Sequence, residues 1–422
     1  MVAKQDFSVN KEDTDIKALR WVVEELLFFT WWVRLQNRVS SWTRGRQLTL
    51  VGIAVAFGAV ARLWAQTKPG NWDFYQWINT SAAVLDGQDP YTLFGYNYPP
   101  PWVMLLAVFN QVTSSVENFR LLIAILMITV DIGIAYLLYK RGYTLAAALF
   151  SLSPVLIAIS GQHQQVDGIT VFLALAGMVL AGLAKGPTLT RYDWGAVLLL
   201  GASLSFKPVF LVFPLWLAMR PGPWRRRLFY LIAPGVVMLL SVATAFVAYP
   251  AGTVIQKIFF HKGMNDSPIL LTFAPHQIAP WLIENGFSKI VFLVLLIAAG
   301  FLFRKLRPFE LALVYAVSAL TFSWAFANQY MASSMAAVAI FLNLGLFLWL
   351  LLASLYVMGD VNSLAIPGFT PVQQNVVLDY VWIGQDLFPW LFMGWILMVL
   401  GLSKQARHML PSKEVRDRED AP

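Results

Sequence analysis

Long apolar runs separated by short polar segments make up most of the chain between Leu48 and Gly401. An α-helix needs about 20 apolar residues to cross the hydrocarbon core of a bilayer, and most of these runs approach or exceed that length. The pattern predicts an all-α fold, a polytopic transmembrane helical bundle of about 10 to 13 crossings with outer-face loops and short amphipathic helices. The runs lie near 47–66, 102–112, 119–139, 144–159, 169–184, 194–219, 228–249, 288–303, 309–326, 331–357 and 378–401.

Two of these runs do not fit a single crossing. Basic residues stand on both sides of 194–219, so this run must return to the side from which it started. Two half-crossings that meet at Lys207–Pro208 would achieve this, because proline breaks a helix. The run 331–357 raises the same problem, with "NLG" at 343–345 as the candidate turn. Broken helices are tolerated where they line a cavity rather than lipid, which indicates a substrate chamber.

The low content of charged residues is typical of a membrane protein, and the positions of the basic residues predict its orientation in the membrane. Only 13% of residues are charged, whereas a soluble domain has about a quarter. The net charge of +8 comes from basic clusters between the apolar runs, a distribution typical of cytoplasmic loops and not of a nucleic-acid groove. The absence of cysteine excludes disulfides, thiol nucleophiles and thiolate metal sites.

The same pattern predicts three parts. Residues 1–46 form a cytoplasmic segment whose stretch 14–43 is expected to lie as an amphipathic helix in the membrane interface, with docking of a partner as the alternative. Residues 47–403 form the transmembrane catalytic domain, and 404–422 a basic cytoplasmic tail. Both termini are therefore expected in the cytoplasm. The outer loops are expected at 67–99, 160–168, 250–287 and 359–377.

The outer loop 67–99 holds three acids of unequal interest. Asp73 lies among aromatic residues just after the first apolar run, where partial desolvation would raise its basicity, as a general base requires. An ordinary solvated carboxylate is the alternative for this residue. Asp86 and Asp89 stand in "LDGQDPY", a sequence typical of a turn after an amphipathic helix at 73–85.

Polar residues also gather at two places within the apolar sequence. The segment "ISGQHQQVDGI" at 159–169 has no Lys or Arg, so we expect it on the same outer face as Asp73, as a site or as a solvated hairpin tip. Lys207 lies inside a long apolar stretch, where it either binds an anionic group such as a phosphate or snorkels from a broken helix. The candidate contacts in the first segment are Gln162, His163, Gln165 and Asp167.

Later segments contribute weaker candidates. Residues 259–281 could bind a lipid phosphate or headgroup, and they lack a tight metal-ligand spacing such as HxxxH. Gln329 ends an apolar run in "FANQYM", and Asp131 lies inside another run without an assigned chemical role. The candidates within 259–281 are His261, Lys262, Asn265 and His276.

Taken in order, these motifs resemble the GT-C superfamily of integral-membrane glycosyltransferases, above all the bacterial polyprenol-phosphate-mannose-dependent mannosyltransferases. The resemblance covers about 70–340. It rests on "DFYQWINTSAAVLDGQDPYTLFGYNYPPPW", "GQHQQVDG", "GASLSFKPVFLVFPLWL", "GMNDSP" and "NQYM".

The resemblance implies a bacterial plasma-membrane enzyme with its active site on the outer face and no metal or other cofactor. Asp73 would be the base that activates a hydroxyl of a lipid or glycan acceptor. That hydroxyl would attack a polyprenyl-phosphate sugar, with mannose the best guess, and invert its anomeric carbon. Lys207, Lys262, His261 and His276 would contact the donor phosphate or lipid. Sugar or acceptor contacts would come from Gln162, His163, Gln165, Asp167, Tyr98, Asn265 and Gln329.

Two departures from the family pattern leave roles open. Asp73 has no acidic neighbour before Asp86, so either Asp86 or Asp89 could assist it. The "GQHQQVDG" loop is longer than a plain "GQxD" pattern, so Gln162 and Gln165 are both candidates for the family glutamine. A transporter or flippase of a lipid-linked sugar is the alternative function, although such proteins more often contain internal repeats, and none is evident here.

Overall fold

We describe the fold from a computed structural model, which covers residues 24–93, 95–260, 267–325, 327–360, 363–367 and 380–405. These ranges contain helices and connecting segments and no β-strand, which confirms the predicted all-α class. In chain order the helices are α2 (Thr30–Ser40), α3 (Arg44–Gln66), α4 (Trp72–Leu85), η1 (Pro90–Thr92), α5 (Pro100–Val112), α6 (Val116–Lys140), α7 (Thr144–Leu152), α8 (Pro154–Leu156), the π-helix η2 (Ile157–His163), α9 (Asp167–Leu183), α10 (Arg191–Phe206), η3 (Pro208–Phe210), α11 (Phe213–Met219), α12 (Trp224–Ala245), α13 (Ala251–Phe259), α14 (Pro268–Phe273), α15 (Ala279–Glu284), α16 (Phe287–Phe303), α17 (Pro308–Thr321), η4 (Asn328–Tyr330), α18 (Met331–Ile340), α19 (Leu344–Gly359) and α21 (Tyr380–Gln405).

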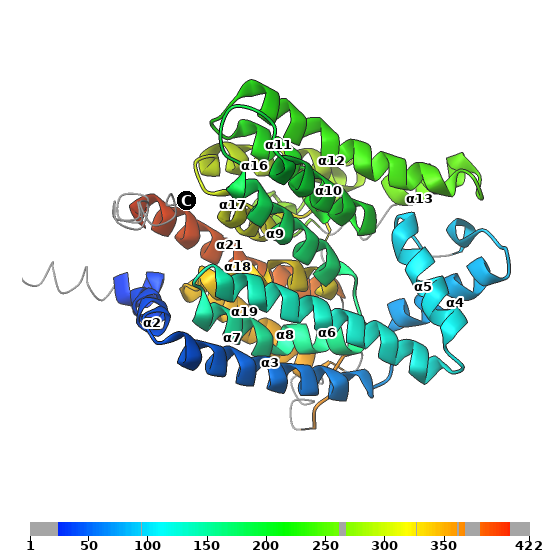
Figure 1. Ribbon diagram of the computed structural model, residues 1–422, viewed down its shortest axis with the longest axis horizontal. Coiled ribbons are helices and arrows are strands. Elements are labelled where there is room, and N and C mark those ends of the chain that lie inside the picture. The colour runs from blue at the N-terminus through cyan, green and yellow to red at the C-terminus, as the bar shows by residue number, and fades with distance from the viewer. Residues whose placement is uncertain are drawn as a thin grey trace, which may run out of the picture.

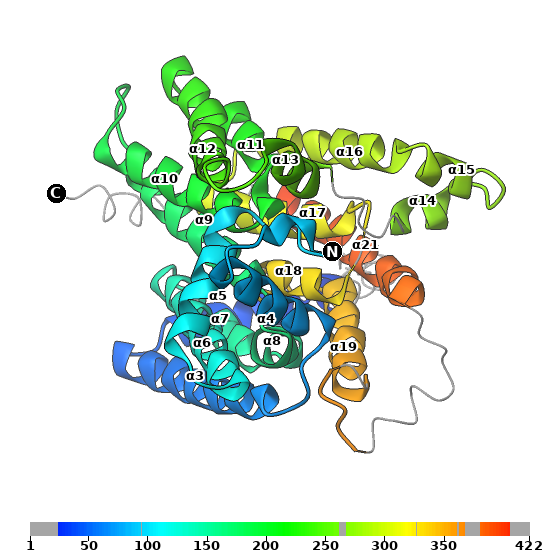
Figure 2. The ribbon, with the colours of Figure 1, turned by 90° about the vertical axis from the view of Figure 1, so that its right-hand side faces the viewer.

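Helices α3 and α6 pack against each other, whereas α12 packs against α10 and α11. In the described part of the chain, α3, α6 and α12 are each long and apolar enough to cross a membrane, and two bent helix pairs could raise the number of spans from three to five. The described residues thus contain three to five candidate membrane-spanning helices, while the larger number of crossings stays a prediction. Helix α2 lies at one end of the bundle and α4, α5 and α13 at the other (Figure 1). We call the latter the α4 end, and Figure 2 looks onto it.

The predicted break at Lys207–Pro208 is confirmed. The axis turns by 114° between Arg191–Phe206 and Pro208–Met219, so the chain reverses at the α4 end. A break exposes backbone groups that cannot remain unpaired in an apolar environment. The hydroxyl of Tyr315 on α17 pairs two of them, because it donates to the Val209 carbonyl at 3.1 Å and accepts from the Val212 amide at 3.3 Å.

A second reversal separates α17 from α18, since these two helices pack against each other and η4 leads directly into α18. Helix α18 is buried along its whole length and ends beside α2, where the indole of Trp32 donates to the Ala339 carbonyl at 3.2 Å. The chain then restarts as α19, and the Asn343 side chain accepts from the Leu346 amide at 3.1 Å to cap it. The turn expected at 343–345 therefore lies at the start of α19. The two reversals meet at the α4 end, where the Lys207 ammonium after α10 lies 4.9 Å from the ring centre of Tyr330 before α18.

The backbones of α19 and α21 approach each other closely where Gly345 meets Gly394. A Cβ atom on Gly345 would lie 2.2 Å from the Gly394 nitrogen and 2.5 Å from its Cα. Small residues at such crossings let the two backbones approach closely, which favours van der Waals packing between membrane helices. The contact holds α21 against the start of α19.

This crossing gives a prediction about stability. Gly345→Ala should destabilise the protein by about 2 kcal/mol, because the added methyl group must push two backbones apart. Gly52→Ala on α3 is the matched control, since nothing lies within 4 Å of its added methyl group. Thermal unfolding of both variants in detergent checks this. Equal melting temperatures would contradict the close contact.

Candidate functional site

The first turn of α4 presents Asp73 at the α4 end of the bundle. Asn71 caps this helix, since its side-chain oxygen accepts a hydrogen bond from the Phe74 amide at 3.0 Å. The predicted helix 73–85 is confirmed, and its buried face includes Phe74 and Trp77. Asp73 lies outside that face and is half-buried. A carboxylate in a first helical turn is stabilised by the helix dipole, so this position suits a negatively charged side chain.

The polar segment "GQHQQVDG" brings a glutamine onto Asp73. The π-helix η2 ends at His163 and is followed by Gln164, whose φ of 57° is left-handed and rare for a residue other than glycine. This turn sends the next side chain back, and Gln165 Nε2 donates to Asp73 Oδ2 at 2.8 Å. Single-turn π-helices and left-handed residues are both concentrated at functional sites. Of the two candidate glutamines, Gln165 is the one in contact with Asp73.

Gln162 has a different role in this segment. Its amide donates to the Pro69 carbonyl at 3.0 Å, and so fastens the π-helix to the connection between α3 and α4. His163 is 1% exposed and sits at the last position of the π-helix. Gln164 donates to the Arg120 carbonyl at 2.9 Å. These bonds fix the segment against α6 and against the connection that leads into α4 and Asp73.

An ion pair lies next to Asp73. Lys207 Nζ is 2.7 Å from Asp167 Oδ2, and the Asp167 side chain is fully buried. Lys207 stands in the break after α10, and Asp167 begins α9. The Lys207 ammonium also lies 5.5 Å from the ring centre of Tyr98 and 4.9 Å from that of Tyr330. A carboxylate and two aromatic rings therefore hold the cation in one place.

The charges of this cluster act on Asp73. Burial raises the pKa of the Asp73 carboxyl above its ordinary value. The Lys207 ammonium and the hydrogen bond from Gln165 lower this pKa, and the Asp167 carboxylate raises it. Asp73 is thus a carboxylate of increased basicity, with a fixed cation nearby and access to solvent. We call Asp73, Gln165, Asp167, Lys207, Tyr98 and Tyr330 the polar cluster.

The other sequence candidates are placed elsewhere or lie outside the description. Gln329 lies next to Tyr330 in η4 and is partly exposed, while His276 is exposed between α14 and α15. His261, Lys262 and Asn265 lie outside the described residues. Within the ranges that the structure describes, no group of three or more acidic or histidine side chains could hold a metal ion.

The two remaining acids of the first outer loop have local roles. Asp89 caps η1, since its side chain accepts from the Tyr91 amide at 2.9 Å. Asp86 is exposed at the end of α4. Both positions match the predicted turn, and within the described residues the side-chain partner of Asp73 is Gln165 rather than either acid.

Sequence reasoning missed two buried arginines, one beside this site and one inside the bundle. Arg120 lies in the second turn of α6, is 9% exposed, and donates to the carbonyls of Lys68 and Gln162. Its guanidinium stacks on Phe74 at 5.0 Å. Arg62 lies within α3, where an isolated charge in an apolar run was the available signal. Asp131 is likewise an isolated acid within an apolar run, but the sequence did not show that Arg62 and Asp131 are in contact.

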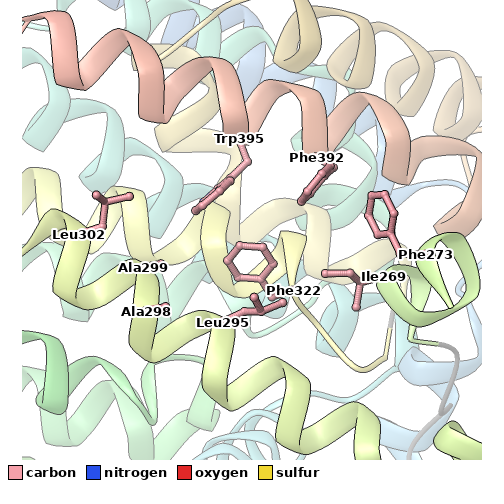
Figure 3. A pocket seen from close by; sticks show the side chains of 9 residues that line it. All are labelled: Ile269, Phe273, Leu295, Ala298, Ala299, Leu302, Phe322, Phe392 and Trp395. Atoms are coloured by element: carbon pink, nitrogen blue, oxygen red, sulfur yellow. The ribbon is translucent and has the colours of Figure 1, made fainter.

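An apolar cavity of about 410 Å³ opens between α14, α16 and α21. Figure 3 shows side chains of these helices converging on it, with Phe322 between those of α16 and α21. Phe322 lines the cavity, and Tyr330, which follows it closely in the sequence, lies at the Lys207 ammonium of the polar cluster. The residues that line the cavity are Ile269, Phe273, Leu295, Ala298, Ala299, Leu302, Phe322, Phe392 and Trp395.

The buried ion pair gives a second stability prediction. Lys207→Met should cost about 3 kcal/mol, because it leaves the Asp167 carboxylate buried without its partner. Asp167→Asn combined with Lys207→Met should recover most of this loss. The exposed Lys289 supplies the control variant Lys289→Met, which should unfold like the wild type. Thermal unfolding in detergent measures all three, and a wild-type melting temperature for Lys207→Met would contradict the pairing.

Comparison with known proteins adds no assignment to this geometry. No family model matches the chain, and no match was found among curated proteins or among solved structures.

Proposed function

We propose that this protein is an integral-membrane glycosyltransferase of the GT-C type. It transfers a sugar, with mannose as the best candidate, from a polyprenyl-phosphate donor to a hydroxyl group of a lipid or glycan acceptor. The observation that carries this proposal is the placement of a half-buried, hydrogen-bonded carboxylate, Asp73, beside the fixed cation Lys207. Base and cation are the two groups that displacement of a phosphate from a sugar requires.

In the proposed reaction Asp73 accepts the proton of the acceptor hydroxyl. The acceptor oxygen then forms a bond to the anomeric carbon while the bond from that carbon to the phosphate oxygen breaks, and the configuration inverts. Gln165 orients the carboxylate through its 2.8 Å hydrogen bond. The lipid phosphate leaves as an anion, which needs a cation or hydrogen-bond donors and no strong acid.

Lys207 is the described cation best placed to stabilise that leaving group. Its contact with Asp167 fixes its position, and 13% of its side chain remains accessible. Lys262, His261 and His276 stay candidates for the same anion. The chemistry needs no metal or other cofactor, because the proton and the leaving anion both have protein partners.

The apolar cavity supports a lipid-linked donor. A polyprenyl tail is a long apolar chain, and a cavity lined only by apolar side chains would take up such a chain. The segment from Phe322 to Tyr330 would then contact both the tail and the phosphate end of the donor. We place the site on the outer face of a bacterial plasma membrane, with both termini in the cytoplasm. Basic residues at the α2 end favour this orientation.

Loss of the base tests the proposed function. Asp73→Asn should lower sugar transfer at least about 100-fold, because an amide cannot accept the proton. Asp86→Asn changes the exposed acid of the same helix in the same way and should retain transfer. The assay uses purified protein, a radiolabelled polyprenyl-phosphate mannose and a membrane-glycolipid extract as acceptor. Wild-type transfer by Asp73→Asn would refute the role of Asp73.

A failed wild-type assay would have a different meaning. If several polyprenyl-phosphate sugars give no product and a labelled donor instead crosses the bilayer of a proteoliposome, the protein is a transporter. That outcome replaces the proposed function as a whole and is separate from a failure of Asp73 alone.

The electrostatics predict a pH dependence. Because the base acts in its deprotonated form, kcat/KM should fall as the pH decreases through the raised pKa of Asp73. Gln165→Met removes a hydrogen bond that lowers this pKa, so the acidic limb of the profile of kcat/KM against pH should move to higher pH. Asp167→Asn removes a carboxylate that raises it, so the limb should move to lower pH. Shifts in the same direction in both variants would contradict the assignment of the limb to Asp73.

A further inference from the structure

Two opposite charges meet inside the bundle, away from the polar cluster. Arg62 Nε on α3 lies 2.8 Å from Asp131 Oδ2 on α6, and the two side chains are 2% and 6% exposed. Both helices are candidate membrane spans. Ionisable groups inside a membrane segment are costly, and a buried ion pair is often no more stable than apolar side chains of similar size. Stability alone is therefore a weak reason for this pair.

The arginine also binds backbone carbonyls of two helices. Its Nη1 donates to the Gly58 carbonyl at 3.0 Å and to the Ser151 carbonyl at 2.8 Å. Gly58 lies one turn earlier on α3, and a Cβ atom there would lie 2.2 Å from the Ser151 oxygen. Arg62 thus joins α3, α6 and the end of α7, just before the chain enters the π-helix.

The pair stands against both ends of the "GQHQQVDG" segment. A Cβ atom on Gly161 would lie 2.8 Å from the Arg62 carbonyl oxygen, so the π-helix rests directly on the Arg62 backbone. At the other end, a Cβ atom on Gly168 would lie 3.5 Å from Asp131 Oδ1. The Ser160 hydroxyl also lies beside the Asp131 carboxylate. Between these two glycines the chain carries the side chains that reach Asp73 and Lys207.

From this arrangement we propose that Arg62 and Asp131 are positioning residues. The ion pair holds the α3 backbone against which Gly161 packs, and the Asp131 side chain lies against Ser160 and Gly168. In this way the two residues fix both ends of the segment 161–168, and so hold Gln165 on Asp73 and Asp167 on Lys207. Neither residue touches the reacting groups. The kinetic part of this inference rests on the proposed function, whereas the effect on the segment can be measured without any substrate.

A double variant separates positioning from stability. Arg62→Met and Asp131→Leu singly leave one buried charge unpaired and should both destabilise the protein. Together they replace the pair by apolar groups of similar volume and should restore thermal stability close to the wild type. If the pair positions the segment, the stable double variant should still have a kcat for sugar transfer lowered about 10- to 100-fold, since small misplacements are costly in catalysis. Its KM for the donor should change less than about threefold.

A wild-type kcat in the stable double variant would overturn the positioning role. If the double variant does not fold, Ser160→Ala provides the test, because it leaves the ion pair in place and removes a group beside it. In that case a positioning role predicts a lowered kcat with unchanged thermal unfolding, and a wild-type kcat counts against it.

A labelling experiment measures directly how often the segment 161–168 opens. The natural chain has no cysteine, so Gln164→Cys supplies a single thiol at a position that is fully buried. Combined with the double variant, this thiol should react with a maleimide about 10-fold faster than in the wild-type background, because the segment opens more often. Gln277→Cys, at an exposed position between α14 and α15, should react equally in both backgrounds.

Labelling also keeps the two proposals apart. Equal labelling of Gln164→Cys in both backgrounds overturns the inference, whether or not the protein transfers sugar. Faster labelling together with a wild-type protein that transfers no sugar removes the proposed function, while the role of the pair in holding the segment stands.

Discussion

Paired backbone groups are the constraint on which this structure depends. A membrane helix satisfies its own amides and carbonyls, so each place where the chain breaks a helix must supply new partners. At the break after α10, Tyr315 supplies two of them. The break then leaves Lys207 directed at Asp167 rather than at lipid. Polar chemistry is concentrated at the α4 end because that is where two helix reversals and a π-helix meet.

The polar cluster contains a balance of charges rather than a single reactive group. Asp73 gains basicity from burial, while Lys207 and Gln165 limit that gain. Asp167 neutralises Lys207 and keeps it in place. A base and a cation can therefore stand close together without simply pairing with each other, which suits a reaction that moves a proton in one direction and releases an anion.

Much of the fold followed from hydrophobic pattern. The apolar runs located the main helices, and the basic residues on both sides of 194–219 indicated the reversal at Lys207–Pro208, which the 114° bend confirms. The helix that carries Asp73 was also predicted within one residue. These features are local, because they depend on apolar length, proline and charge along one stretch of chain.

The sequence by itself determined that the chain is helical, that some of its helices can span a membrane, and that Asp73, Lys207 and the segment 159–169 are unusual. Only the tertiary structure decided which of them meet. Gln165 rather than Gln162 reaches Asp73 because one left-handed residue, Gln164, turns the chain after the π-helix. Partners that are far apart in sequence, such as Arg62 and Asp131, are chosen by how helices pack, and a residue pattern along one chain does not record that choice.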